Sequence, residues 1–454
     1  MINRRSFLGA GAVLLGSRLH AAASQPNILI ITTDQQFADA VSCRMGTRYL
    51  HTPNLDSLAA NGTFFSRAYC ANPLCVPSRT SMFTGHYPVE TGVMDNDDAK
   101  KEVDPRKFPG IGKVFESAGY QTAYFGKWHI SSPVKQPEVS GFADAAAKND
   151  DPLTASNAVK FLRGKHDAPF LMWASFLNPH NICEWARGEE LPLGDIGNPP
   201  PVDQCPPWRP NHAPQSNEPD IVALMRKSYQ SSPTFPVGNF DEKKWREYLW
   251  AYYRLIEKVD GQIGVVLRAL RETGLEKNTV VVFTADHGDC QGSHGWNQKT
   301  ILYEEAARVP FIVSYPGVVA KGVATRLVNT GIDLIPTLCD YAGVAAPAGL
   351  PGLSLKDAGH DPRQYVVVCN RMVQGAAVDG RIPKPDGRML RGQRHKYTVY
   401  SEGHRREALV DLENDPGEMV NLAGDARFEK VLKEHRELLA AWCRKSGDLF
   451  PTVA

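Results

Sequence analysis

The chain has 454 residues, with 51 basic side chains against 50 acidic ones and 42% hydrophobic residues, a composition typical of a globular protein. This composition excludes a disordered chain, a collagen-like chain and a polytopic membrane protein. The near-neutral charge gives no electrostatic footprint for nucleic acid or for stable binding to a membrane, so an anionic substrate would have to be met by a local site.

The first 23 residues have the layout of a cleavable export signal. Arg4 and Arg5 precede an apolar stretch at 7–15, and three alanines end the segment at Ala23. The apolar stretch is too short to cross a bilayer. The paired arginines resemble the twin-arginine signal, so we expect a bacterial protein exported by the twin-arginine translocase to the periplasm or the cell exterior. An ordinary secretory signal or an uncleaved anchor is the alternative.

After the signal, the predicted elements alternate between strands and helices, which favours an α/β sheet. The runs 27–33 and 279–285 are apolar and β-branched, as is typical of strands buried on both faces of a parallel sheet. A long helix is expected from about Glu242 to Thr273. The other elements expected here are strands at 121–125, 170–176 and 311–314 and helices at 53–60, 111–118, 154–162 and 333–342.

A proline-rich segment interrupts this alternation. Residues 191–220 hold nine prolines, too many for a helix or a central strand, so we expect a long surface loop. The loop is either a plain insertion or one wall of a substrate cleft.

The end of the chain has a different texture, with shorter alternating strands. These strands are expected at 365–369, 396–400 and 408–412, before an amphipathic helix at 428–443. The length allows two or three domains, or one large domain with an appendage. We therefore predict three parts, which are the signal at 1–23, a large α/β domain at 24–358 and a C-terminal α+β subdomain at 359–454.

Two of the predicted strands end in an aspartate. Asp34 follows the run at 27–33, and Asp286 follows the run at 279–285. Ligands of open α/β sheets bind beyond the carboxyl ends of the strands, so the two carboxylates are candidates for one shared site. Taken alone, either aspartate is as well explained as a strand-end cap or a turn residue.

Cys75 has the most informative context of the nine cysteines. The nine are scattered, with no C-x-x-C pair, and few or no disulfides are expected. Pro77 is favoured in the first turn of a helix, which places Cys75 near a helix N-terminus, where free amides and the helix dipole favour negative charge. Arg79 returns to the same face one turn later. These neighbours predict a thiol of lowered pKa, with a buried inert cysteine as the alternative.

The motif C-x-P-S-R at 75–79 resembles the signature of the formylglycine-dependent sulfatases, which belong to the alkaline phosphatase superfamily. In that family the cysteine is converted to Cα-formylglycine by a formylglycine-generating enzyme. The resemblance covers almost the whole chain after the signal, because further motifs follow in the family's order. They are PNILIITTDQ at 26–35, GKWH at 126–129, NPH at 178–180, ADHG at 285–288, HGWNQK at 294–299, YEE at 303–305, RVP at 308–310, and LVDLENDPGE at 409–418 with NL at 421–422.

The resemblance implies an alkaline-phosphatase-like fold, in which helices sandwich a mostly parallel sheet, with a smaller C-terminal α+β subdomain. It also implies one divalent cation, bound by Asp34, Gln35, Asp286 and His287. Mostly oxygen ligands favour Ca²⁺, with Mg²⁺ as an alternative, and the imidazole leaves Mn²⁺ open. Many members have Asp-Asp and Asp-Asn where this chain has Asp34-Gln35 and Asp286-His287, a departure that concerns the identity of the ion.

The family's chemistry assigns the nucleophile to the modified Cys75. Its aldehyde would be hydrated to a geminal diol, and one hydroxyl, polarised by the cation and Arg79, would attack the sulfur of a sulfate ester. His129 would then deprotonate the second hydroxyl, which expels sulfate and restores the aldehyde. A thiol offers no such elimination, so the modification is a prerequisite for this chemistry.

The resemblance also implies residues that hold the substrate. His180 would protonate the leaving alcohol, while Lys127 and Lys299 would bind sulfate oxygens. His294 is a further predicted substrate-binding residue. For each of them alone, a satisfied histidine or a solvated lysine is the simpler interpretation, and their place in ordered motifs reverses that balance. Sugar contacts are sought among Asn181, Cys183, Glu184, Trp185, Arg187, Trp296 and Asn297.

We therefore expect an exported sulfuric ester hydrolase that releases sulfate from a sulfated carbohydrate. An exo-acting enzyme for oligosaccharide ends fits a pocket-type site. Three alternatives stay open: a phosphonate or phosphate ester hydrolase of the same superfamily, a choline-sulfatase-like enzyme for small esters, and a non-catalytic protein that binds sulfated glycans.

Overall fold

The computed structural model describes residues 25–356 and 363–453. The predicted export signal and the predicted boundary between residues 358 and 359 lie outside these ranges. None of the helices in the two ranges is long and apolar enough to span a membrane. All nine cysteines lie within them, and none of the nine forms a disulfide.

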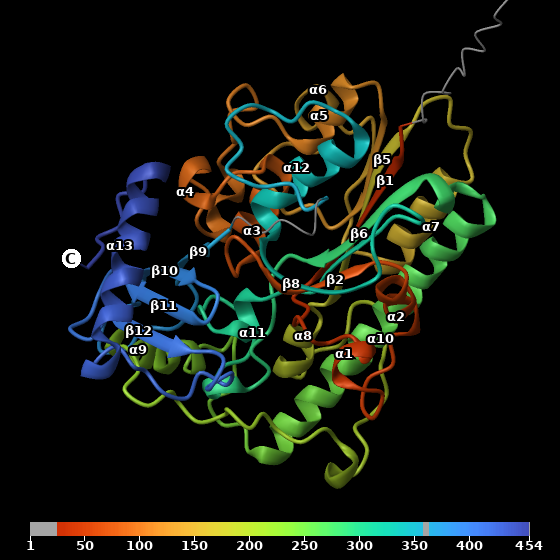
Figure 1. Ribbon diagram of the computed structural model, residues 1–454. Coiled ribbons are helices and arrows are strands. Elements are labelled where there is room, and N and C mark those ends of the chain that lie inside the picture. Colours follow the sequence, from red (N-terminus) through yellow and green to blue (C-terminus); the bar gives the residue numbers. More distant parts are fainter. Residues whose placement is uncertain (1–24, 357–362, 454) are drawn as a thin grey trace, which may run out of the picture.

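A mixed, mostly parallel sheet forms the centre of the described part of the chain (Figure 1). Its eight strands follow the order β4-β3-β5-β1-β6-β7-β2-β8, and β7 runs antiparallel to both of its neighbours. The sequence therefore predicted the fold class correctly. In sheet order the strands are β4 (Asp144–Ala146), β3 (Gln121–Gly126), β5 (Phe170–Pro179), β1 (Asn27–Asp34), β6 (Thr279–Ala285), β7 (Phe311–Ser314), β2 (Thr63–Tyr69) and β8 (Gly322–Asn329).

Helices cover both faces of this sheet, because alternate residues of its strands point to opposite sides. On one face, Leu29 and Ile31 of β1 pack in a core that receives Ile263 of the long helix α10. On the other face, Ile28 packs in a core with Phe83 of α3. The first layer contains α2 (Pro53–Ala60), α7 (Asp151–Leu162) and α10 (Glu242–Glu272), and the second contains α3 (Cys75–Thr84), α5 (Ile111–Ser117) and α12 (Thr330–Ala342).

The proline-rich segment forms a long loop with a single short 3-10 turn, η2 (Val202–Gln204), before α9 (Asp220–Gln230) begins. This agrees with the sequence-based expectation, because proline supplies no amide hydrogen to a helix or a ladder. The remaining short elements are α1 (Ser42–Met45), α4 (Pro88–Thr91), η1 (Asn96–Lys100), α6 (Pro137–Ser140), α8 (Ile182–Arg187), η3 (Leu275–Asn278), η4 (Ser293–Gly295), α11 (Glu304–Ala307) and η5 (Ala426–Phe428).

The C-terminal residues form a second, antiparallel sheet beside the large one, drawn in blue in Figure 1. Its order is β12-β11-β10-β9, and a long helix, α13, follows it in the chain. The elements are β9 (Val366–Arg371), β10 (Asp386–Arg391), β11 (His395–Tyr400), β12 (Glu407–Asp411) and α13 (Glu429–Ser446).

Buried ionic contacts join this second sheet to the segment around α11. Lys396 of β11 forms an ion pair with Glu418, and both side chains are almost fully buried. The backbone amide of Glu304 donates to Glu418 Oε2 at 2.6 Å. Tyr69 at the end of β2 donates to Glu304 Oε2 at 2.8 Å and accepts a hydrogen bond from Arg391. Buried charges of this kind are tolerated only when they are paired, so the two sheets are held in one relative position.

Glu418 gives this junction a pH dependence. Burial and the nearby Glu304 and Glu305 carboxylates together raise the pKa of Glu418 to about 7, against the effect of Lys396. A carboxyl whose pKa is higher in the folded state stabilises the fold below its unfolded pKa of about 4.5, and this contribution is lost as the pH rises past 7.

We expect Glu418→Gln to remove this pH-dependent contribution to the stability of the fold. Between pH 5 and pH 8, the unfolding free energy of the unsubstituted protein should fall relative to that of the variant by on the order of 2 kcal/mol. Urea unfolding at four pH values measures the difference. Parallel pH profiles for the two proteins would contradict this expectation.

Candidate active site

The carboxyl ends of four adjacent strands, β3, β5, β1 and β6, bring polar residues to one edge of the large sheet. Asp34 ends β1, Asp286 follows β6, His180 follows β5 and Lys127 follows β3. The strand register pairs Asp34 with Pro179, next to His180. Sequence reasoning placed Asp34 and Asp286 at one site, and the strand order explains why the other two join them.

Gly126 permits the chain to leave β3 at this point. Its φ of 104° lies in the left-handed region that favours glycine, and a Cβ atom there would lie 1.9 Å from the carbonyl oxygen of Ser175. The side chain of Lys127 is thereby turned toward Asp34, and its Nζ lies 2.6 Å from Asp34 Oδ2.

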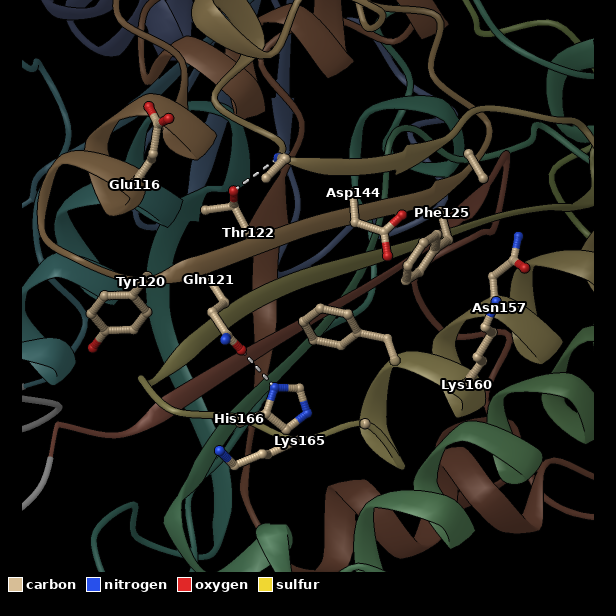
Figure 2. Close-up of a pocket in the computed structure, with 14 residues that line it drawn as sticks. Glu116, Tyr120, Gln121, Thr122, Phe125, Asp144, Asn157, Lys160, Lys165 and His166 are labelled. Carbon is tan, nitrogen blue, oxygen red and sulfur yellow. Dashed lines mark hydrogen bonds between the residues drawn. The ribbon is translucent and has the colours of Figure 1, made fainter.

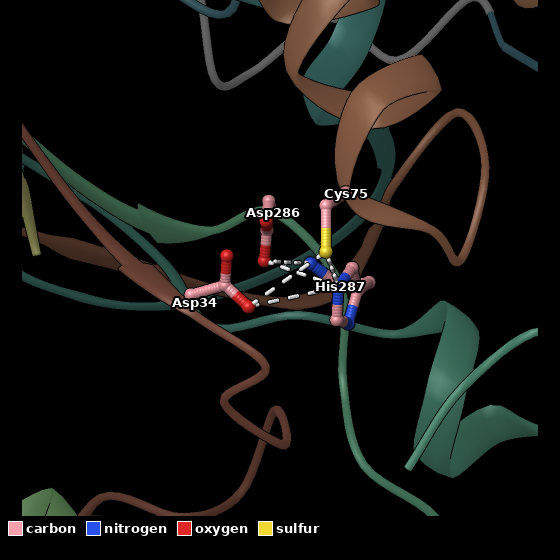
Figure 3. Close-up of side chains that lie close together, drawn as sticks. All are labelled: Asp34, Cys75, Asp286 and His287. Atoms are coloured by element: carbon pink, nitrogen blue, oxygen red, sulfur yellow. Dashed lines mark hydrogen bonds and ion pairs between the residues drawn. The ribbon is translucent and has the colours of Figure 1, made fainter. Parts of the chain in front are cut away.

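Four buried side chains form a compact cluster at this edge (Figure 3). Asp34, Cys75, Asp286 and His287 each offer one ligand atom, and these atoms lie within 4.8 Å of one another. Cys75 Sγ lies 3.3 Å from His287 Nε2 and 4.0 Å from Asp34 Oδ1. The set combines two carboxylates with an imidazole, which suits a divalent cation.

Cys75 is the first residue of α3, as Pro77 in the first turn predicted. The amide of Val76 donates to Asn96 Oδ1 at 3.1 Å, and Gly85, with φ 74°, ends the helix. The thiol itself is 1% exposed. Lys299 Nζ approaches Sγ to 3.1 Å. The thiol is therefore held at a helix N-terminus beside a fixed positive charge.

Arg79 bridges the two strand-end aspartates. Its Nε donates to Asp286 Oδ2 at 2.8 Å, and its Nη2 donates to Asp34 Oδ2 at 3.0 Å. Nη1 donates to the carbonyl oxygen of Lys127 and to Ser175 Oγ. The guanidinium is fully buried, so these contacts fix both carboxylates in a medium of low polarity.

The charges of the cluster shift the pKa values of its members. Burial and Asp34 oppose ionisation of Cys75, but Lys299, Lys127 and His287 outweigh them and hold the pKa of the thiol well below its usual value. Burial likewise opposes ionisation of Asp34, but Lys127 and other neighbouring cations hold its pKa well below its usual value. The sequence predicted a thiol of lowered pKa at this position, and the geometry supplies the cause.

The cluster also shifts the pKa of His180. Burial, Lys127 and Lys299 together lower the pKa of His180 to about 4, against the effect of Asp34. The imidazole of the protein alone is therefore neutral at pH 7. A bound sulfate group would place negative charge among the same residues and would oppose this lowering.

Two other predicted histidines stand apart from the cluster in their contacts. His129 follows Lys127 by two residues, is half-buried, adopts a φ of 48°, and has a buried Nδ1 without a hydrogen-bond partner. His294 is fully buried and stacks on Tyr303 at 3.8 Å between ring centroids. Burial lowers the pKa of His294, together with the charges of Lys396 and Arg226 and against those of Glu305 and Glu218. Its role in substrate binding stays a prediction.

Gln35 completes the predicted cation ligands. Its side-chain oxygen, Oε1, accepts a hydrogen bond from Lys299 Nζ at 2.9 Å, and its amide nitrogen donates to Asp289 Oδ2 at 2.8 Å. An amide oxygen beside two carboxylates and one imidazole is a donor set that hard divalent cations accept. The residues present therefore fit the implied cation.

Sequence reasoning missed several residues that support the site. Ser175 receives Arg79, Asp289 receives Gln35, and the hydroxyl of Tyr248 donates to Asp289 at 3.1 Å. Asp289 follows the ADHG motif directly, which was the available signal. Tyr248 lies on α10, and only the folded structure relates that helix to the site.

A separate cavity of about 460 Å³ lies beside β3 and β4 (Figure 2). Residues of β3, α7 and the loop after α7 line it, and His166 Nδ1 lies 2.8 Å from Gln121 Oε1. None of the predicted catalytic or cation-binding residues lines this cavity. It is therefore distinct from the candidate active site.

A mostly parallel α/β sheet with paired carboxylates, a cation-compatible donor set and basic side chains at its carboxyl edge defines a hydrolase of anionic esters. The family model described as Sulfatase matches residues 26–344. A second model, N-sulphoglucosamine sulphohydrolase, C-terminal, matches residues 292–445. The chain belongs to the sulfatase family, and it is a hydrolase of sulfate esters. The resemblance seen in the motifs is thereby confirmed.

Individual relatives are similar over most of their length. The Delta 4,5-hexuronate-2-O-sulfatase of Bacteroides thetaiotaomicron is 34% identical, with 96% of this chain and 93% of the relative covered. The N-acetylglucosamine-6-O-sulfatase of the same organism is 27% identical, with 91% and 86% covered. The solved structure of a 2-O GAG sulfatase has a TM-score of 0.81 at 30% identity, with 95% of each chain covered. A phosphonate monoester hydrolase of Agrobacterium radiobacter, at 21% identity, shares the fold, with a TM-score of 0.74 and 93% and 96% covered.

Proposed function

We propose that the chain releases inorganic sulfate from a sulfated carbohydrate, with formylglycine made from Cys75 as its nucleophile and one divalent cation, Ca²⁺ in preference to Mg²⁺ or Mn²⁺. The observation that carries this proposal is the position of Cys75. Cys75 is the first residue of α3, and its side chain contacts Lys299 and faces Asp34 and His287. A sulfatase needs its nucleophile at such a meeting point of anionic ligands and fixed cations.

The residues of the chain divide the work. Asp34, Gln35, Asp286 and His287 hold the cation, which when bound supplies positive charge for the sulfate oxygens and for the hydrated aldehyde. Arg79 holds both aspartates in place. Lys127 and Lys299 bind sulfate oxygens, since each carries a buried ammonium next to Asp34 or Cys75.

Proton transfer falls to the two histidines of the GKWH and NPH motifs. The charges of Lys127, Lys299 and Asp34 act on His180. His180 protonates the leaving alcohol. His129 takes a proton from the second hydroxyl of the hydrated aldehyde, which releases sulfate. Its buried Nδ1 lacks a partner among the described residues.

The substrate is a saccharide, because the relatives at 34% and 27% identity are named for sulfated hexuronate and N-acetylglucosamine. The protein acts in the periplasm or outside the cell if the twin-arginine interpretation of residues 1–23 holds. Folded export would then follow conversion of Cys75 by a formylglycine-generating enzyme.

We expect His180→Gln to separate leaving groups. Turnover of a sugar sulfate should fall by about 10²- to 10⁴-fold, because an alkoxide needs a proton as it leaves. Turnover of 4-nitrophenyl sulfate should fall much less, because its phenolate leaves without help. Steady-state kinetics of both esters measure the contrast, and equal losses would remove His180 from the role of general acid.

A substrate panel tests the proposed function. Sulfated mono- and oligosaccharides that differ in sulfate position, choline sulfate, and aryl phosphate and phosphonate esters are assayed for release of the anion. Dominant turnover of a saccharide sulfate supports the proposal. Dominant turnover of a phosphonate or phosphate ester, or of choline sulfate, would overturn it in favour of the corresponding alternative.

A further inference from the structure

Gln35 occupies a strained position at the end of β1. Its φ of 68° lies in the left-handed region, which a non-glycine residue adopts only when its surroundings impose it. Hydrogen bonds hold the backbone on both sides of this residue, and the amide of Gln35 donates to Asp286 Oδ1 at 3.0 Å. The hydroxyl of Tyr252 on α10 donates to the carbonyl oxygen of Gln35 at 2.7 Å and accepts from the amide of Phe37 at 2.8 Å. The backbone of Gln35 is therefore held from α10.

The side chain of Gln35 has two unlike ends, and its neighbours distinguish them. An ammonium can only donate, so Lys299 Nζ at 2.9 Å requires the oxygen Oε1 on its side. A carboxylate can only accept, so Asp289 Oδ2 at 2.8 Å requires the nitrogen Nε2 on the other side. Together they place the oxygen on the side of Lys299, whose Nζ also lies 3.1 Å from Cys75 Sγ.

Asp289 is itself held in one orientation. Its Oδ1 accepts a hydrogen bond from the backbone amide of Gln291 at 2.7 Å, and its Oδ2 accepts from Gln35. The hydroxyl of Tyr248 lies within 3.1 Å of Oδ2 and 3.3 Å of Oδ1. Asp289 is fully buried, and its distance from Gln35 leaves no room for water between them. Tyr248 and Tyr252 lie one helical turn apart, so α10 supports both the backbone and the amide of Gln35.

We infer that Asp289, held by Tyr248, is a positioning residue that keeps the amide oxygen of Gln35 directed at the cation. This rests on the proposed function, in which Gln35 is a cation ligand. A carboxylate at position 35 has two equivalent oxygens, so its orientation would not matter, and it would repel Asp289. The Asp34-Gln35 form of the site therefore depends on an acceptor at position 289, and the two residues act as a pair.

Asp289→Asn tests this dependence with almost no change in shape. The backbone amide of Gln291 still requires an acceptor, so the oxygen of the substituted side chain takes the place of Oδ1 and its NH₂ group faces Gln35. Two NH₂ groups would then oppose each other, so the Gln35 amide would lose its anchor at position 289 and its oxygen, with Lys299 as its remaining partner, would no longer be held in one position. We expect the affinity for Ca²⁺ to fall by about 10- to 100-fold, the range for residues that orient metal ligands.

Gln35→Glu in the D289N background reverses the direction of the hydrogen bond without changing the total charge. The new carboxylate at position 35 accepts from the new amide at position 289 and presents an oxygen to the cation as well, so the affinity for Ca²⁺ should return. Asp260→Asn is the matched control. Asp260, on α10, is likewise a buried carboxylate, and it accepts from Asn54 and Leu55, remote from Gln35. This variant should bind Ca²⁺ like the unsubstituted protein.

Isothermal titration of the EDTA-treated, dialysed proteins with Ca²⁺ measures these affinities without turnover. A loss in D289N that Q35E/D289N restores supports the inference. Equal losses in both, or no loss in D289N, would overturn it and leave the proposed function intact. No binding of Ca²⁺ by the unsubstituted protein would overturn the inference together with the proposed cation. Should D289N fail to fold, Tyr248→Phe serves in its place, with a smaller loss expected and no change overturning the inference.

Discussion

Cys75→Ala should reduce the release of sulfate by at least about a thousandfold, because the variant has no side chain from which the nucleophile can form. The fold should survive, since the substitution removes one buried sulfur at the start of α3 and leaves Pro77 and the ion pairs of Arg79 unchanged. Free sulfate released from the saccharide that the panel selects measures the effect.

Cys70→Ala is the matched control for this result. Cys70 is as buried as Cys75 but lies outside the C-x-P-S-R motif, so it should not be modified. Both cysteines lie in the tryptic peptide 68–79, where mass spectrometry should find Cys75 changed by loss of H₂S and gain of oxygen and Cys70 still open to alkylation. Equal activity of C75A and the unsubstituted protein would refute the nucleophile, and equal loss in C70A would point to a packing effect.

Arg79→Ala should destabilise the protein by about 3–5 kcal/mol and abolish measurable activity. The substitution leaves the buried carboxylates of Asp34 and Asp286 without the guanidinium that lies 2.8–3.0 Å from them. Removing one partner of a buried ion pair strands the other charge in a medium of low polarity. Urea unfolding in EDTA measures the loss. Saturating Ca²⁺ should recover part of it, because a cation neutralises the same carboxylates.

Arg388→Ala is the control that separates a loss of stability from a loss of activity. Arg388 of β10 forms a buried bidentate pair with Asp448, which follows α13, at 2.6 and 3.0 Å, and among the described residues it forms no hydrogen bond or ion pair with the cluster. Its loss should destabilise the fold by a similar amount, with activity per folded molecule retained and no recovery on addition of Ca²⁺. Recovery by Ca²⁺ in both variants, or in neither, would contradict the assigned role of Arg79.

Much of the large sheet was predictable because its central strands are buried on both faces. The runs that became β1 and β6 are almost free of charge, and their boundaries were predicted to within a residue. The strands β2, β4, β8 and β10 were missed, and β4 has only three residues, two of them exposed. β2 and β10 contain arginine among apolar residues, and β8 begins with an exposed glycine, so periodicity alone did not separate them from loops.

The site residues that belong to sequence motifs were predictable. Those that only long-range packing brings to the site were not. Asp34 and Cys75 stand in motifs that point to their surroundings, and the structure brings them to 4.0 Å of each other. The support from Tyr248 and Ser175 depends on which helix and which strand lie beside β1, which is information that long-range packing supplies. For His294, whose motif suggested a substrate contact, the structure shows a ring stacked on Tyr303, and the substrate contact stays a prediction.

The strand order β3-β5-β1-β6 also has a consequence for the folding of the chain. The residues that it brings together are as distant in sequence as Asp34 and Asp286, and no short segment contains both. A partly folded chain therefore lacks the cation site altogether, because each strand must close its long loop before the ligands meet. Since the ion would bind the completed sheet alone, its concentration sets how far the equilibrium lies toward the native state. A cation bound at the centre of the sheet would thus stabilise the native chain and no partly folded one.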